Sequence, residues 1–178
     1  MKAIRLLLVS FFVLCVSTTN VVANSVTDQT YPKAQAEVFE TFVAIAESIT
    51  KGAGHGSGLD NEYLNQLISF HAYGDKFVEF NNGEVFDSEG NENSERMLFG
   101  TMVIPGGVKQ FAPLGDSLKI AVYYGNVANL TFISDFILDV DVGNGVEEWR
   151  INNLITLLFV KTKGEWKMVH EHHSPYTP

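Results

Sequence analysis

The chain has 178 residues, of which 46% are hydrophobic and 19% are charged. This composition is typical of a globular protein rather than a disordered one, and the length suits one domain with a sizeable core. The formal net charge of −9 disfavours nucleic acids and anionic membranes as partners. We therefore expect a single acidic domain.

Residues 1–23 have the pattern of a secretory signal peptide. Lys2 and Arg5 form a basic start, residues 6–16 are an almost unbroken apolar run, and residues 21–23 suit a cleavage site. A membrane anchor is the alternative, but the run is short for a spanning helix and polar residues follow it directly. We predict an exported protein, secreted or periplasmic, without stable membrane association after cleavage.

The cysteine content follows from this assignment. The single cysteine of the sequence, Cys15, lies inside the predicted signal peptide. The exported chain would have no disulfide, no thiolate nucleophile and no cysteine-ligated metal. Its stability would come from the core alone.

Two helices are predicted at the start of the domain. Residues 24–33 are polar and predicted to be a flexible lead-in. Residues 33–51 carry apolar side chains at helical spacing, and a glycine-rich stretch at 52–58 ends that helix. Asp60 is predicted to cap a second, shorter helix that ends near Phe70.

A first hairpin is predicted after the helices. Residues 75–80 alternate in polarity, which predicts a strand with Phe77 and Glu79 on one face. An Asn-Asn-Gly turn at 81–83 leads to a short return strand at 84–86.

The middle of the chain combines a polar stretch with an apolar one. Residues 87–96 are polar and acidic, so we predict an exposed loop. Residues 97–104 are apolar and are interrupted at 105–107 by Pro-Gly-Gly, and a helical turn is predicted over 108–111.

The last third is rich in strand-forming residues. Residues 117–124 and 127–142 predict a hairpin, and a second turn at 143–145 leads into a long strand at 148–162 and then a closing strand. Two helices followed by this meander predict an α+β fold, in which the helices pack on the concave face of one curved antiparallel sheet. A lipocalin-like barrel is the alternative, which the two leading helices disfavour.

The end of the chain carries a family resemblance. Thr156 and Lys161 precede Lys-Gly-Glu-Trp at 163–166 and Val-His-Glu-His-His-Ser at 169–174. This pattern resembles the end of SnoaL-like proteins of the NTF2-like superfamily, and the association domain of calcium/calmodulin-dependent kinase resembles the same motif. The resemblance places the domain at residues 34–174 and leaves residues 175–178 as a tail.

The resemblance implies a conical α+β fold with a cavity between helices and sheet, commonly dimeric through the sheet. It implies no single function, since the superfamily includes isomerases, dehydratases, cyclases and non-enzymatic binding or assembly domains. Leu154 stands where many relatives carry a basic residue. Arg150, on the same strand face, is the candidate substitute.

Strand alternation places Trp166, Met168, His170 and His172 on one face of the closing strand, and the two leading apolar residues predict that this face is buried. Three interpretations of the histidine pair stay open. They are buried structural residues, groups that polarise or deprotonate a ligand, or two metal ligands that lack a third. No metal or cofactor is predicted.

Other polar residues are candidates for the cavity. A carboxylate in an apolar cavity has a raised pKa and suits a general base, and a tyrosine can donate to a developing oxyanion. The candidate catalytic residues are His170, His172 and Glu79, and the candidate pocket residues are Tyr73, Asp75, Tyr123, Arg150, Trp166 and Met168, with Tyr124 as a further possibility. Asn129 begins a glycosylation sequon.

The predicted function is to bind a small, largely apolar ligand in a pocket and to perform cofactor-free acid–base chemistry of the isomerase or dehydratase type. The alternative is a non-catalytic module for ligand binding, dimerisation or assembly. The predicted partners are a small-molecule ligand and a second copy in a homodimer, with no nucleic acid.

Overall fold

The computed structural model describes residues 30–52 and 58–177. The predicted signal peptide, most of the lead-in and part of the glycine-rich stretch lie outside these residues. Within them, no helix has both the length and the apolar character needed to cross a bilayer.

The elements follow the predicted order, with one helix more than predicted. In the described part of the chain the helices are α1 Pro32–Glu47, α2 Glu62–Ser69 and α3 Ser88–Met97, and single π-helical turns at Ser48–Gly52 and Leu98–Met102 extend α1 and α3. The strands are β1 Val78–Asn81, β2 Glu84–Phe86, β3 Val103–Pro113, β4 Lys119–Tyr123, β5 Val127–Asp141, β6 Val146–Ile151, β7 Asn153–Thr162 and β8 Glu165–Pro175.

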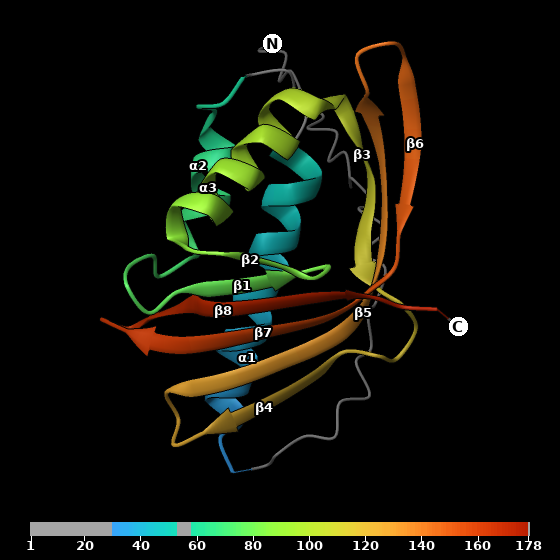
Figure 1. Cartoon of the computed structure of the whole chain (residues 1–178). Coiled ribbons are helices and arrows are strands. Elements are labelled where there is room, and N and C mark those ends of the chain that lie inside the picture. Colours follow the sequence, from blue (N-terminus) through green and yellow to red (C-terminus); the bar gives the residue numbers. More distant parts are fainter. Residues whose placement is uncertain (1–29, 53–57, 178) are drawn as a thin grey trace, which may run out of the picture.

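The strands form one curved sheet with the helices along one side of it (Figure 1). The strand order is β2-β1-β8-β7-β5-β3, and β4 and β6 also pair with β5. The α+β prediction is confirmed. The sheet is mixed rather than antiparallel throughout, because β1 runs parallel to β8. Local patterning carries no information on this pairing, since the two strands are distant in sequence.

The core lies between α1 and the sheet. Val38, Phe42 and Ile45 recur at helical spacing on α1 and are buried. Phe42 meets Phe132 of β5 edge to face, with ring centroids 5.1 Å apart. This helix was predicted from the same apolar spacing, and burial of its apolar face is what stabilises it.

The second helix begins one residue later than predicted. The side chain of Asn61 accepts a hydrogen bond from the backbone N–H of Leu64 at 2.8 Å, so Asn61 rather than Asp60 is the N-cap. Asp60 instead accepts a hydrogen bond from the side chain of Asn65 at 2.7 Å.

The strand predicted over 148–162 is divided into β6 and β7. β6 pairs with the second half of β5 and β7 pairs with its first half, so the chain bends between them at Asn152. Asn152 donates to the carbonyl oxygen of Ser134 at 2.7 Å, and the N–H of Asn153 donates to the Ser134 hydroxyl at 2.9 Å. These bonds hold the bend and leave Ser134 and Asn153 on the inner side of the sheet.

The helical turn predicted over 108–111 is wrong, because β3 runs from Val103 to Pro113 without ending at Pro105. Irregular pairing with β5 between Val103 and Gln110 accommodates the proline and glycines. A Cβ atom on Gly107 would lie 2.7 Å from the carbonyl oxygen of Asp139, so only glycine fits there without movement of the backbone.

The exposed loop predicted over 87–96 is wrong, because these residues form α3. The side chain of Asp87 accepts from the N–H of Gly90 at 2.9 Å and caps the helix. Apolar periodicity is missing because the inward face of α3 is polar. Asn91 is fully buried, and Glu95 and Phe99 follow it at intervals of four residues.

Asp87→Ala should lower the free energy of unfolding by about 1 kcal/mol, because an N–H of the first helical turn loses its partner. Urea unfolding monitored by circular dichroism measures this change. Asp75→Ala, at an exposed position shortly before β1, is the matched control and should change stability by less than about 0.5 kcal/mol. Equal effects of the two substitutions would contradict the capping role.

Candidate functional site

A β-bulge in β8 decides which side chains enter the interior. Met168 pairs with Phe159 and His170 with the preceding Leu158, so Val169 is an extra residue without a partner on β7. One extra residue inverts the inward–outward alternation of a strand. Trp166 and Met168 are buried as predicted, but the inward positions after the bulge belong to Glu171 and His173.

The bulge lies where β8 changes its neighbour. The N–H of Met168 donates to the carbonyl oxygen of Phe70 at 2.8 Å, and Met168 in turn accepts from the N–H of Ala72 at 2.7 Å. From His170 onward the strand pairs with β1 instead. The inward position of Glu171 therefore depends on partners nearly a hundred residues away.

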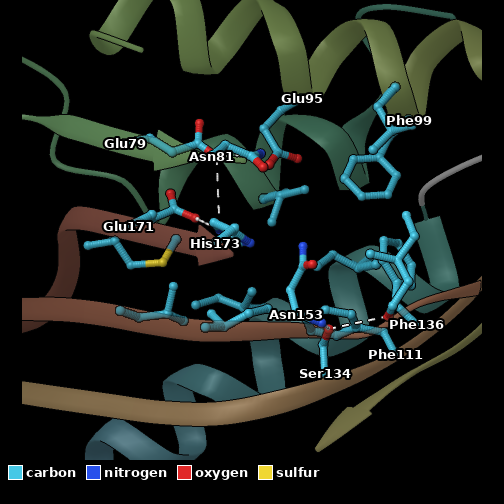
Figure 2. A pocket seen from close by; sticks show the side chains of 18 of the residues that line it. Glu79, Asn81, Glu95, Phe99, Phe111, Ser134, Phe136, Asn153, Glu171 and His173 are labelled. Atoms are coloured by element: carbon cyan, nitrogen blue, oxygen red, sulfur yellow. Dashed lines mark hydrogen bonds and ion pairs between the residues drawn. The ribbon is translucent and has the colours of Figure 1, made fainter. Parts of the chain in front are cut away.

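A cavity of about 180 Å³ lies between the helices and the sheet. Most of its wall is apolar and includes the rings of Phe99, Phe111, Phe132 and Phe136. Figure 2 shows Glu79, Asn81, Glu171 and His173 gathered toward one end, with phenylalanine rings at the other. The cavity thus has an apolar body and a polar end.

Glu171 is the centre of the polar end. Its carboxylate accepts from Nε2 of His71 at 2.7 Å and from Nε2 of His173 at 3.3 Å. Burial opposes ionisation of Glu171, yet the charges and hydrogen bonds of His71 and His173 lower its pKa below the ordinary value. Burial also disfavours the two imidazolium ions, but Glu171 raises the pKa of both histidines. The three side chains therefore form a hydrogen-bonded triad in which the ionised forms of the carboxyl group and of the imidazoles stabilise one another.

Glu79 joins this triad from β1. Its carboxylate accepts from Nδ2 of Asn91 at 2.8 Å and from Nδ2 of Asn81 at 2.9 Å, and it lies 3.9 Å from Nε2 of His173. The amide oxygen of Asn91 accepts from the hydroxyl of Tyr73. Burial, followed by the nearby carboxylates, raises the pKa of Tyr73, so this hydroxyl stays a neutral donor. Glu79 lines the cavity, and its catalytic role stays a prediction.

Glu95 is the polar residue that sequence reasoning missed. It projects from α3 into the cavity toward His173 (Figure 2). Its Oε2 atom is buried and has no hydrogen-bond partner among the described residues. Burial, together with the charge of Glu171, raises its pKa to about 7. The four-residue spacing of Asn91, Glu95 and Phe99 is the signal that could have revealed it.

Comparison with known proteins agrees with this architecture. Residues 110–178 match the SnoaL-like domain family. An NTF2-like superfamily protein from Salmonella enterica shares 15% identity over 82% of this chain and 92% of its own, with a TM-score of 0.62. The fold is NTF2-like. The resemblance predicted from the closing motif is confirmed.

Two further structures share the NTF2-like fold. A protein from Streptomyces avermitilis, provisionally named a dehydratase of the NTF2-like family, is 15% identical over 84% of this chain and 100% of its own, with a TM-score of 0.63. A protein from Xanthomonas campestris, provisionally named a calcium/calmodulin-dependent protein kinase II association domain, is 17% identical over 79% of this chain and 86% of its own, with a TM-score of 0.56. At these identities the likeness concerns the fold alone. No curated protein matches the chain.

His170 and His172 do not line the cavity of this NTF2-like domain, so their predicted inward placement is wrong. The bulge turns them to the outer face, where they flank the ring of Phe80 at centroid distances of 5.6 and 6.4 Å. Nδ1 of His170 lies 2.8 Å from the carbonyl oxygen of Val78. Within the described residues, no group of three or more histidine, cysteine, aspartate or glutamate side chains is placed to hold a metal ion.

The remaining predicted pocket residues are mostly elsewhere. Met168 lines the cavity. Trp166 is buried outside it and donates Nε1–H to Glu37 of α1 at 3.1 Å. Tyr73 stacks on His71 with centroids 4.9 Å apart, behind the cavity wall. The candidates that instead lie exposed on the surface are Asp75, Tyr123, Tyr124 and Arg150.

Proposed function

We propose that this chain binds a small, largely apolar molecule in the cavity and performs cofactor-free acid–base chemistry on it, of the isomerase or dehydratase type. The observation that carries the proposal is the carboxyl group of Glu95, which is buried, unpartnered among the described residues and directed into an apolar cavity. A carboxyl group with a pKa near neutrality can both accept and donate a proton at physiological pH.

The neighbouring groups suit a division of roles. Ionised Glu95 would remove a proton from the ligand. His173, whose pKa is raised by the hydrogen bond and charge of Glu171, would in its protonated form donate a proton to a leaving hydroxyl or a developing oxyanion. Nε2 of His173 is engaged by Glu171, whereas Nδ1 makes no hydrogen bond to the described residues. His71 hydrogen-bonds the other oxygen of the Glu171 carboxylate.

The comparisons support this proposal without deciding it. Glu171 and His173 lie within the stretch that matches the SnoaL-like domain family, and one similar structure is provisionally named a dehydratase. The provisional association-domain name of another favours the second candidate, a non-catalytic binding or assembly module. A turnover measurement separates the two.

A neutral nitrobenzisoxazole is a suitable test compound, because it needs only a base in an apolar site. The carboxylate takes the C–H proton, the released electron pair forms a nitrile, and the N–O bond breaks to give a coloured phenolate. The protein should catalyse this ring opening faster than acetate does at the same carboxylate concentration, since the cavity desolvates and orients the base.

The pH dependence of this reaction should report Glu95. Because burial raises the pKa of Glu95 to about 7, the carboxylate fraction rises as pH rises through about 7. The rate constant should therefore increase about tenfold per pH unit below that value and level off above it. Stopped-flow or plate absorbance of the phenolate measures the profile. No catalysis above acetate would refute the catalytic proposal and favour the non-catalytic module.

A further inference from the structure

Among the residues that the structure describes, the side chain of Asn153 is a second cavity-lining group without a hydrogen bond. Asn153 begins β7, is 9% exposed and lines the cavity. Its backbone N–H donates to the hydroxyl of Ser134 at 2.9 Å, but its side-chain amide makes no hydrogen bond to the described residues. Buried amides are nearly always hydrogen-bonded, so an amide left open toward a cavity is available to a ligand.

Asn153 and Glu95 reach the cavity from opposite sides. Figure 2 shows Glu95 descending from α3 and Asn153 rising from the sheet. Phe99, Phe111 and Phe136 lie beside them and close the apolar end. A ligand in this space would meet aromatic rings along its body and one hydrogen-bonding group on each side.

The charges around the cavity disfavour acidic ligands. Three carboxylates line it, from Glu79, Glu95 and Glu171, whereas none of its described lining residues is lysine or arginine. Both histidines of the lining, His71 and His173, are already engaged by Glu171. An anionic ligand would therefore lose its hydration and meet more carboxylates than cationic groups in the cavity.

We propose that Asn153 is a specificity-determining residue, and that its amide hydrogen-bonds the polar group of a non-acidic, single-ring molecule such as an alcohol or ketone. The inference rests on the proposed function only in taking the cavity as the ligand site. The size follows from the volume of about 180 Å³, since an apolar cavity of about 150 Å³ holds benzene.

Three ring compounds of nearly equal size test the proposal. Propylbenzene, phenethyl alcohol and phenylacetate differ in ending with a methyl, a hydroxyl or a carboxylate group. Binding is measured by calorimetry at pH 8, with Asn153→Leu as the test variant and Asn129→Leu as the control. Asn129 lies on the outer face of the same sheet, between buried Ala128 and Leu130.

Wild-type protein should bind phenethyl alcohol at least as well as propylbenzene, and phenylacetate at least about tenfold more weakly. Asn153→Leu should weaken phenethyl alcohol about three- to tenfold, the usual effect of one lost hydrogen bond. The same variant should leave propylbenzene unchanged, which also reports an intact cavity. Should Asn153→Leu fail to fold, Asn153→Ala is measured with the same expectation.

The outcomes distinguish a wrong role for Asn153 from a wrong proposed function. If no compound binds, the cavity is not a ligand site, and the proposed function fails together with the inference. If propylbenzene binds but phenylacetate matches phenethyl alcohol, or if Asn153→Leu affects both neutral compounds equally, only the role of Asn153 is overturned.

Discussion

Replacing Glu95 with glutamine should slow the ring opening of nitrobenzisoxazole by about 100-fold or more, the usual contribution of a positioned general base. Glutamine keeps the shape of the side chain but cannot accept the proton. The residual rate should also lose its dependence on pH near 7, because that dependence comes from ionisation of this carboxyl group.

Glu92→Gln is the matched control for this variant. Glu92 lies on the same helix but pairs with Arg96 at the surface, at 2.8 Å. It should retain the rate and the pH profile of the wild type. If Glu95→Gln behaves like Glu92→Gln, another group is the base and the proposed role of Glu95 is wrong.

The free energy of unfolding should depend on pH in the way expected of a buried Glu95 carboxyl group. Its folded-state pKa of about 7 lies above the ordinary 4.5, so the protonated form stabilises the fold fully below pH 4.5. This contribution is lost as pH rises toward about 7. The Glu95→Gln variant cannot lose a proton there, so its stability should fall less than that of the wild type over this interval.

Replacing Glu171 with alanine should lower the free energy of unfolding by about 3–5 kcal/mol, the usual cost of breaking a buried ion pair. The carboxylate is the direct partner of both His71 and His173. Without it, two imidazoles would stay buried in an environment that disfavours their charged forms. Urea unfolding of wild type and variant at pH 6 measures the difference.

Glu165→Ala is the control for this second variant. Glu165 lies on the same strand, but its side chain is 71% exposed and pairs with Lys167 at the surface, so the cost should stay below about 1 kcal/mol. A cost for Glu171→Ala in the same range would contradict the central role of the triad.

The pH dependence of the Glu171→Ala effect follows from the pKa directions. The lowered pKa of Glu171 stabilises the fold above its ordinary 4.5, and that part is lost as pH falls through the folded-state value. The raised pKa values of His71 and His173 stabilise it below their ordinary 6.5, and that part is lost as pH rises through the folded-state values. The destabilisation should therefore be larger near pH 5.5 than near pH 9.

Patterns within single elements were sufficient for most of the fold. The apolar spacing of Val38, Phe42 and Ile45 predicted α1, because a helix buries one face at that period. The Asn- and Gly-containing turns at 81–83 and 143–145 predicted the two hairpins, because these residues favour the backbone of tight turns. The closing motif predicted the NTF2-like fold, which the comparisons confirm. Export and homodimer formation stay predictions.

The site was less accessible to sequence reasoning, because its key residues break the local patterns. Helix α3 was not predicted, because its inward face carries the polar residues Asn91 and Glu95 instead of apolar residues at helical spacing. Its single strong local signal is the capping side chain of Asp87.

The sequence by itself determined the closing strand, its aromatic start and its histidines. Only the tertiary structure decided which of these face the cavity. The bulge at Val169 forms where β8 leaves Phe70 and meets β1, and alternation along one strand cannot reveal a residue that lacks a partner on another. For this reason the inward residues are Glu171 and His173, and the predicted pair lies on the outer face.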